Sequence, residues 1–225
     1  MKTLVKVFIL FITTVIFAQN PIEKAVGDFS ELKVYDLIEV ELVKSNDNKV
    51  IITGENKADV IINNKNGTLK IKMKLEEAFD GNKTKIVLHY TALDVIDVNE
   101  GAKVLSDDTI KQFEIDLRAQ EGGKINVPVN VTYTNIKAVT GGIITVTGKS
   151  KNQNISISTG GTYQGSEFKT DKTEVNIKAA GEAHVNASKL VDVKIRAGGD
   201  VFIYGNPETV NESKVLGGRI KRMNE

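Results

Sequence analysis

The sequence contains no cysteine and no tryptophan, and only three prolines occur among its 225 residues. Without cysteine the chain can form neither disulfides nor Cys-ligated zinc sites, and it offers no lipid-accepting thiol. Aromatic residues make up 6% of the chain, so stacking platforms for sugars or nucleic-acid bases are scarce. A protein of this composition must be stabilised by its apolar core.

Neither sign of charge is in excess, because 30 basic residues face 29 acidic ones. Loss of residues 1–18, expected below, leaves 28 basic and 29 acidic side chains. A near-neutral surface of mixed sign lacks the basic footprint that nucleic acid or an anionic membrane requires. We therefore expect no nucleic-acid partner.

Long apolar runs are also missing, apart from one at the start that extends from Val7 to Phe17. It follows Lys2 and Lys6 and is itself followed by Ala18, a pattern typical of a secretory signal peptide cleaved after Ala18. The run is too short to span a bilayer comfortably, so the mature chain is expected to carry no transmembrane anchor. The sequence predicts export to the periplasm, the cell surface or the exterior.

What the sequence does contain is a motif that recurs, with its clearest copy at Ala197-Gly198-Gly199-Asp200-Val201. The first small residue of each copy, taken as its anchor, lies at position 101, 122, 141, 160, 180, 198 or 217. Their spacings of 21, 19, 19, 20, 18 and 19 residues indicate stacked structural repeats.

The residues around each copy alternate in polarity, as in Ile155-Ser156-Ile157 before the motif and Tyr163 after it. Such alternation predicts a short strand, a glycine corner and a second short strand. A period of about 19 residues is too short for a propeller blade, and the leucine-rich signature is absent. We therefore predict an all-β fold, a parallel β-helix of about seven turns stacked about 4.8 Å apart. The glycines expected at its corners are Gly101, Gly122, Gly141, Gly160, Gly181, Gly198 and Gly217.

The preceding stretch, residues 19–90, is rich in predicted strands but not periodic, and Asn66-Gly67 is a hairpin signal. We expect these strands to cap one end of the solenoid, which occupies residues 91–220 and is followed by a tail at 221–225. No proline-rich or serine-rich linker separates the two parts, so we expect them to be continuous. Basic residues that would discourage edge pairing at the far end are Lys214, Arg219, Lys221 and Arg222.

The entry strand from Phe29 to Val34, the glycine-cornered repeats and the segment from Val201 to Pro207 (VFIYGNP) together resemble the head GIN domain family. These are auto-transporter adhesin-like proteins found mostly in Bacteroidota, and the resemblance covers about residues 22–220. It implies a right-handed parallel β-helix and an exported location, with no catalytic residues to carry over. Ala180 departs from the pattern, since a glycine is typical there.

Two acids provide the enzymatic alternative. Glu182 and Asp200 occupy the same outward column one turn apart, which would bring their carboxylates to about 5 Å by the strand spacing. That separation suits a retaining glycosidase, but two solvated acids beside Thr162 and Arg219 are the preferred interpretation, because acids on a solvent-facing surface are ordinary and no aromatic subsites surround these two.

The sequence offers few other candidate site residues. Phe202 and Tyr204 have outward parity and are candidate surface contacts, whereas His184 is interpreted as a lone surface histidine. Asp108-Thr109-Ile110 resembles a Bacteroidota O-glycosylation sequon, which makes Thr109 a candidate modification site. No histidine spacing suits a metal, and no cofactor is expected.

The sequence thus favours an exported, non-catalytic β-helix that presents a binding surface in the cell envelope or at the cell surface. Its partner would be an envelope protein or a glycan, and a homo-oligomer is compatible with the pattern. A polysaccharide-active enzyme using Glu182 and Asp200 is the alternative hypothesis.

Overall fold

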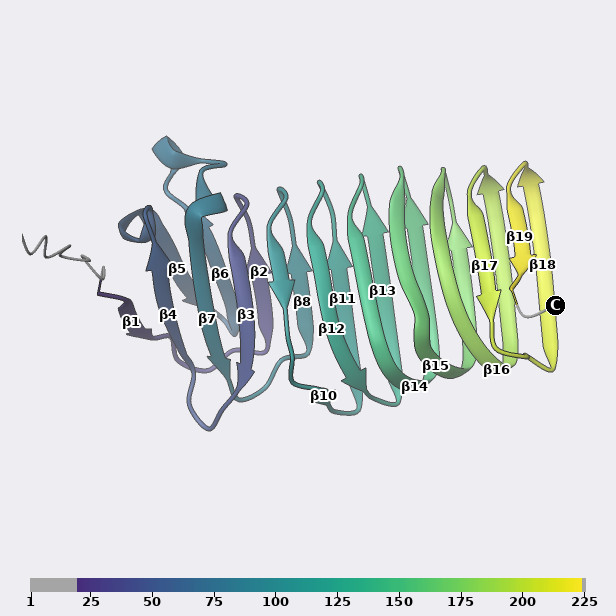
Figure 1. Ribbon diagram of the computed structural model, residues 1–225, viewed down its shortest axis with the longest axis horizontal. Coiled ribbons are helices and arrows are strands. Elements are labelled where there is room, and N and C mark those ends of the chain that lie inside the picture. Colours follow the sequence, from purple (N-terminus) through teal and green to yellow (C-terminus); the bar gives the residue numbers. More distant parts are fainter. Residues whose placement is uncertain (1–19, 224–225) are drawn as a thin grey trace, which may run out of the picture.

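The computed structural model describes residues 20–223 of the chain, and their strands stack into one long β-solenoid (Figure 1). The predicted all-β fold, with about seven turns at a period of about 19 residues, is confirmed. Among these residues no α-helix occurs, and no helix is long and apolar enough to cross a membrane. Three short 3-10 helices are present: η1 (Lys57–Asp59), η2 (Leu75–Glu77) and η3 (Gly81–Lys83). The predicted signal peptide lies outside the described residues.

Each regular turn contributes strand segments to two parallel faces. The strands of this part are β8 (Val95–Val98), β9 (Lys103–Leu105), β10 (Ile110–Lys111), β11 (Glu114–Ala119), β12 (Lys124–Asn130), β13 (Tyr133–Val139), β14 (Ile143–Ser158), β15 (Gly161–Ile177), β16 (Gly181–Ala197), β17 (Asp200–Tyr204), β18 (Thr209–Leu216) and β19 (Arg219–Arg222). One face, here called the β8–β18 face, joins β8, β11, β13, the second halves of β14 to β16, and β18. The opposite β9–β19 face joins β9, β12, the first halves of β14 to β16, β17 and β19.

The apolar core follows from this stacking, because residues of like parity align from turn to turn. On the β8–β18 face one buried column reads Ile96, Leu117, Ile136, Ile155, Val175 and Val193. On the β9–β19 face the matching column contains Val104, Ile125, Ile144, Tyr163, Ala183 and Val201. Burying such a side chain contributes about 1.5–3 kcal/mol, so each turn is stabilised by the turns above and below it.

The corners between the two faces form one long edge, here called the corner edge. At each corner two successive residues have positive φ, as at Thr159 (52°) and Gly160 (75°). A side chain would fit at Gly160, so glycine is required there for its positive φ. At Gly161 glycine is required because a side chain would not fit. A Cβ on Gly161 would lie 2.1 Å from the carbonyl oxygen of Ala138 in the neighbouring turn. Ala180 takes the same left-handed angle (47°) without the freedom of glycine.

The N-terminal strands cap one end, as predicted, but they are threaded unexpectedly. They are β1 (Ile22–Ala25), β2 (Glu31–Val34), β3 (Glu39–Lys44), β4 (Lys49–Gly54), β5 (Val60–Lys65), β6 (Thr68–Met73) and β7 (Thr84–Tyr90). The turn made by β2 and β3 lies between the later pairs β6–β7 and β8–β9, and all these contacts are parallel.

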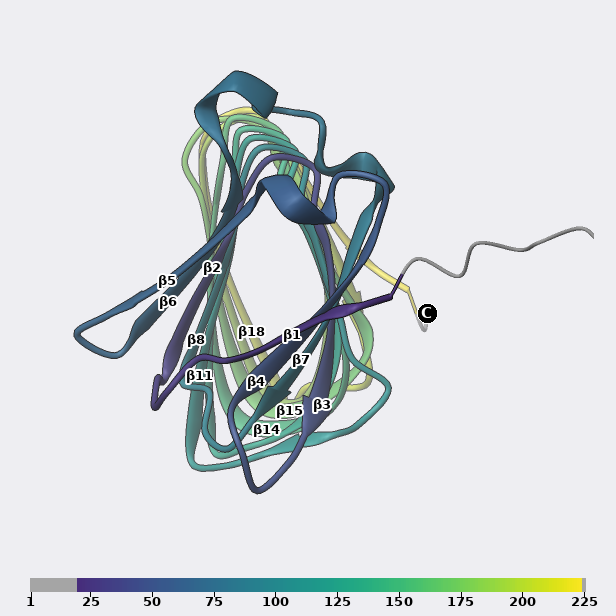
Figure 2. The same cartoon turned by 90° about the vertical axis from the view of Figure 1, so that its left-hand side faces the viewer.

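Antiparallel strands complete the cap, because β4 pairs with both β1 and β7 and β5 pairs with β6. The β5–β6 hairpin turns at Asn66 and Gly67, both with positive φ as a type I′ turn requires, and it extends beyond the stack (Figure 2). The boundary at residue 90 stays a prediction.

Candidate functional site

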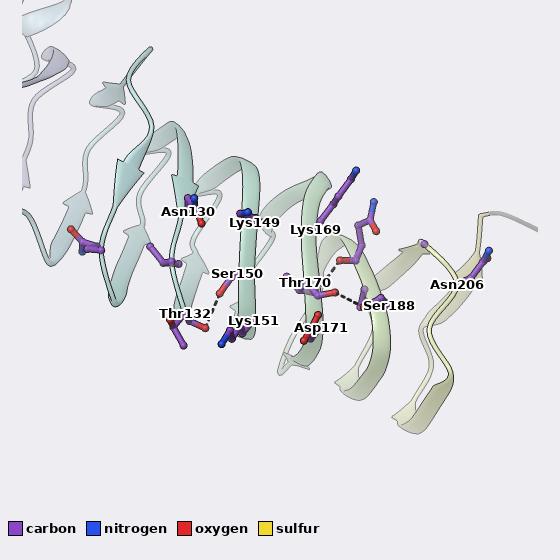
Figure 3. A pocket seen from close by; sticks show the side chains of 15 residues that line it. Asn130, Thr132, Lys149, Ser150, Lys151, Lys169, Thr170, Asp171, Ser188 and Asn206 are labelled. Carbon is purple, nitrogen blue, oxygen red and sulfur yellow. Dashed lines mark hydrogen bonds between the residues drawn. The ribbon is translucent and has the colours of Figure 1, made fainter.

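A groove runs along the edge opposite the corners, where β14, β15 and β16 bend from one face to the other. We call it the bend-edge groove; it has a volume of about 680 Å³ and crosses several turns (Figure 3). Its lining begins at Asn130, at the end of β12, and reaches Gly205 and Asn206, just after β17. An elongated cavity that crosses stacked turns suits an extended ligand.

One rim of the groove is a column of long polar side chains. Asn130, Lys149, Lys169 and Asn186 are register partners on successive turns. Both lysines are exposed, and among residues 20–223 neither takes part in an ion pair or a side-chain hydrogen bond. The strands that carry the two lysines lie about 4.8 Å apart. Both ammonium groups therefore remain available to an anionic ligand.

The floor of the groove is made of hydroxyl groups that the protein itself satisfies. Ser150 Oγ lies 3.1 Å from the Thr132 carbonyl oxygen, and Thr170 Oγ1 lies 2.9 Å from that of Asn186. Ser188 donates to the Thr170 carbonyl at 3.2 Å. Because these hydroxyls are held by backbone acceptors and no histidine lines the groove, none is activated as a nucleophile.

The second rim carries the groove's one carboxylate, that of Asp171. Lys189 Nζ lies 2.9 Å from it, and this hydrogen bond holds the pKa of Asp171 below its ordinary value. Lys151 adds a weaker electrostatic attraction to the same carboxylate. With Asp171 engaged by Lys189, the three lining lysines leave the groove with a positive charge.

A buried polar network fixes the bend beneath the groove. Thr173 Oγ1 donates to Gln153 Oε1 at 3.2 Å, and the hydroxyls of Thr170 and Thr173 lie 2.7 Å apart. Gln153 also donates its side-chain amide to the hydroxyl of fully buried Tyr163, and burial raises the pKa of that phenol. The network leaves the groove floor little freedom to rearrange.

The structure places Glu182 and Asp200 opposite each other in register, but it engages each with a different partner. Arg219 forms two hydrogen bonds to Asp200, at 2.8 and 2.6 Å, and they hold the pKa of Asp200 below its ordinary value. Glu182 instead lies 2.8 Å from His184. Asp200 therefore cannot be the acid of a glycosidase, which requires a raised pKa, and as a nucleophile it would have to release Arg219, which occupies both of its oxygens.

The two aromatic candidates and the histidine form one cluster. The His184 ring stacks on Phe202 with centroids 4.6 Å apart, and its Nδ1 lies 3.1 Å from the Tyr204 hydroxyl. Phe202 and Tyr204 are partly exposed. His184 is therefore not isolated; the sequence signal for its contact with Glu182 was the i, i+2 spacing on one strand face.

The remaining candidates are placed as follows. All seven predicted corner glycines have positive φ: Gly101, Gly122, Gly141, Gly160, Gly181, Gly198 and Gly217. Thr109 is exposed between β9 and β10, where a modifying enzyme has access. Within residues 20–223 no group of three or more histidine or acidic side chains is arranged to hold a metal ion.

Sequence reasoning missed the bend-edge groove. A signal existed, because Asn130, Lys149 and Lys169 recur at intervals of 19 and 20 residues, close to the period of the corners. These three residues can be recognised as one column only once the bend between the two faces has been located in the structure.

Comparison with known proteins agrees with this architecture. A family model described as "Putative auto-transporter adhesin, head GIN domain" matches residues 28–207. No match to a curated protein is significant.

Solved structures from Bacteroidales are similar in fold. A protein titled a putative adhesin from Bacteroides fragilis has a TM-score of 0.83 at 17% identity, over 90% of this chain and 96% of that one. A protein titled a putative lipid binding protein from Parabacteroides distasonis scores 0.70 at 20% identity, over 92% and 98%. A further putative adhesin, from Parabacteroides merdae, scores 0.69 at 14% identity, over 91% and 95%.

Proposed function

Because the chain belongs to the head GIN domain family of auto-transporter adhesins, we propose that it is an exported, non-catalytic binding scaffold of the cell envelope or cell surface. Its ligand site is the bend-edge groove. The pattern of residues 1–18 supports export, and the solved structures of the same fold that are titled "putative adhesin" support a surface-binding role.

The observation that carries this proposal is the column of Lys149 and Lys169 on a groove that crosses successive turns. Both ammonium groups lack an ion-pair partner among the described residues. A strand-spaced row of cations along a hydroxyl-rich and amide-rich channel is complementary to an extended chain that carries repeated anionic groups and hydroxyls. Acidic polysaccharide is the envelope polymer with that chemistry.

The geometry around Glu182 and Asp200 supports the non-catalytic interpretation. Arg219 keeps Asp200 ionised, and neither acid lines the bend-edge groove. A polysaccharide held in that groove would have no acid and base placed across its glycosidic bond.

The test is binding of polygalacturonate, an acidic polysaccharide, measured by calorimetry with neutral dextran as the comparison. We expect Lys149→Gln combined with Lys169→Gln to weaken polygalacturonate binding about tenfold, since two exposed ion pairs contribute up to about 1 kcal/mol each. Raising the salt concentration should weaken binding to the unmodified protein in the same direction.

The matched control is Lys178→Gln, an equally exposed lysine near the corner edge whose side chain has no partner among residues 20–223. It should bind polygalacturonate as the unmodified protein does. Equal losses at Lys178 and at the groove lysines would show non-specific charge attraction and refute the groove as the site. Depolymerisation of polygalacturonate by the protein, abolished by Glu182→Gln, would refute the non-catalytic role.

A further inference from the structure

Two exposed aromatic rings meet on adjacent turns of the β8–β18 face, at the end of the bend-edge groove. The Phe113 side chain is 67% exposed and that of Tyr133 is 43% exposed, and their ring centroids lie 5.3 Å apart at an interplanar angle of 56°. The pair forms an open angle toward solvent. Keeping two large rings in water forgoes the gain of burying them, so this surface requires an explanation.

Backbone hydrogen bonds fix the positions of the two residues that carry the rings. The carbonyl oxygen of Phe113 accepts hydrogen bonds from the N–H groups of Thr132 and Tyr133, at 2.9 and 3.0 Å. These bonds fix the residue before β11 against the start of β13. Little ordering cost therefore remains for a ligand that contacts both rings.

Carboxylates line the cavity beside the Phe113 ring. A cavity of about 420 Å³ beside Phe113 is lined by Asp94, Glu114 and Asp116, together with Val95 and Gln112. Gln112 also lines the bend-edge groove, so the two cavities adjoin.

Only one of the three acids is neutralised by a cation. Arg118 pairs with Asp116 at 2.7 Å, and the amide of Asn135 donates to Glu114 and Asp116 at 2.8 and 2.7 Å. Among residues 20–223, Asp94 and Glu114 have no ion-pair partner.

We propose that the Phe113–Tyr133 pair, with Asp94 and Glu114, binds an ammonium group, as carried by a lysine-rich segment of a partner protein. Ring faces and unpaired carboxylates both attract cations, and the two attractions add where a cation lies over the ring with a carboxylate beside it. A neutral sugar would use the rings but would leave the excess negative charge uncompensated. The proposal of this site does not depend on the proposed polysaccharide groove. The two adjoining sites are opposite in charge.

The experiment titrates the purified protein with pentalysine and follows backbone amide shifts by NMR. We expect shifts in residues 112–116 and 133–135, about a three- to fivefold loss of affinity on Phe113→Ala, and a similar loss on Glu114→Gln. Both side chains are exposed, so the variants should keep the melting temperature of the unmodified protein. Higher salt should weaken the binding.

Phe79→Ala is the matched control, because Phe79 is 61% exposed in the N-terminal cap and lies far from this site in the stack. It should leave pentalysine binding unchanged. Pentalysine binding that is insensitive to Phe113→Ala would overturn the proposal, as would maltohexaose binding that requires Phe113 while pentalysine binding does not. Polygalacturonate binding should be unaffected by Phe113→Ala, so this site and the groove can fail separately.

Discussion

Glu100 shows what the corner edge demands of a single side chain. It has a positive φ of 51°, and its backbone carbonyl accepts the N–H of Leu37 at the aligned corner of the preceding turn. Burial raises the pKa of the Glu100 carboxyl above its ordinary value, and the nearby acids Asp36 and Glu121 raise it further. Stacking turns in register thus aligns like charges as readily as it aligns apolar side chains.

A raised pKa in an acid means that folding favours the protonated form. Below the unfolded pKa of about 4.3 the Glu100 carboxyl is protonated in both states, and the stability that this form provides is fully present. As the pH rises through the folded pKa the carboxyl ionises, and the free energy of unfolding falls. We expect Glu100→Gln to raise the free energy of unfolding at pH 7 by roughly 0.5 kcal/mol, after allowance for solvent screening. Urea denaturation at pH 7 and pH 4 measures this, and the gain should shrink toward zero at pH 4.

Glu174→Gln provides the comparison, since Glu174 is exposed in the middle of β15. Its effect on the free energy of unfolding at pH 7 should be small. A Glu100→Gln variant that is no more stable than the unmodified protein at pH 7 would contradict the crowding of acids at this corner.

Residue columns on the flat faces could be predicted from sequence because parity and a near-constant period determine them. The alignment of Glu182 with Asp200 and Arg219 is found as expected. The Phe113–Tyr133 contact could not be predicted in this way. Phe113 precedes β11 in a connection, where no alternation rule says which way a side chain points.

The strand β18 ends the β8–β18 face of the described stack and differs from the strands that precede it on that face. Glu212 and Lys214 stand in register with buried Val193 and Ile195, so charged residues occupy positions that are apolar elsewhere. Val215 and Leu216 are each 71% exposed. Inward-pointing charges on an edge strand discourage pairing with another chain, which adds to the basic residues expected at this end.

Replacing Glu212 and Lys214 with valine should remove that protection. We expect the Glu212→Val, Lys214→Val double variant to self-associate, because its end turn then presents an apolar row and free backbone groups to a second copy. Light scattering coupled to size-exclusion chromatography measures the mass. The control is Asn211→Val with Ser213→Val, which places the same residues at the alternate positions of β18 and should stay closer to the mass of the unmodified protein.

The unequal spacings of the repeats correspond to irregular pairing of the long strands. Intervals of 20 and 18 residues coincide with register shifts, where β15 pairs irregularly with β14 and β16. These irregularities lie near the bend edge, and they shape the groove that holds Lys149 and Lys169. A period treated as constant predicts the stack but does not reveal the register shifts beside the proposed ligand site.

The molecule as a whole behaves as a one-dimensional array, because each regular turn contacts only its neighbours. Deleting residues 124–142 removes one period of 19 residues and brings Ile143 into the position of its register partner Lys124. We expect this variant to fold, with an unfolding m-value lower by about one tenth, the share of residues 20–223 that is removed. Deleting only residues 124–133 leaves half a turn out of register and should prevent cooperative unfolding, as measured by urea titration with circular dichroism.

The interleaving of β2 and β3 between strands that come later in the chain governs the order of assembly. A polypeptide made from its N-terminus forms this first turn before either flanking layer exists, and both layers must close around it from downstream sequence. The remaining turns can then be added one after another in chain order. The earliest coil is therefore sealed on both sides only once the chain as far as β9 has joined it, so we expect the slow step of folding to lie at the capped end and not in the long regular rod.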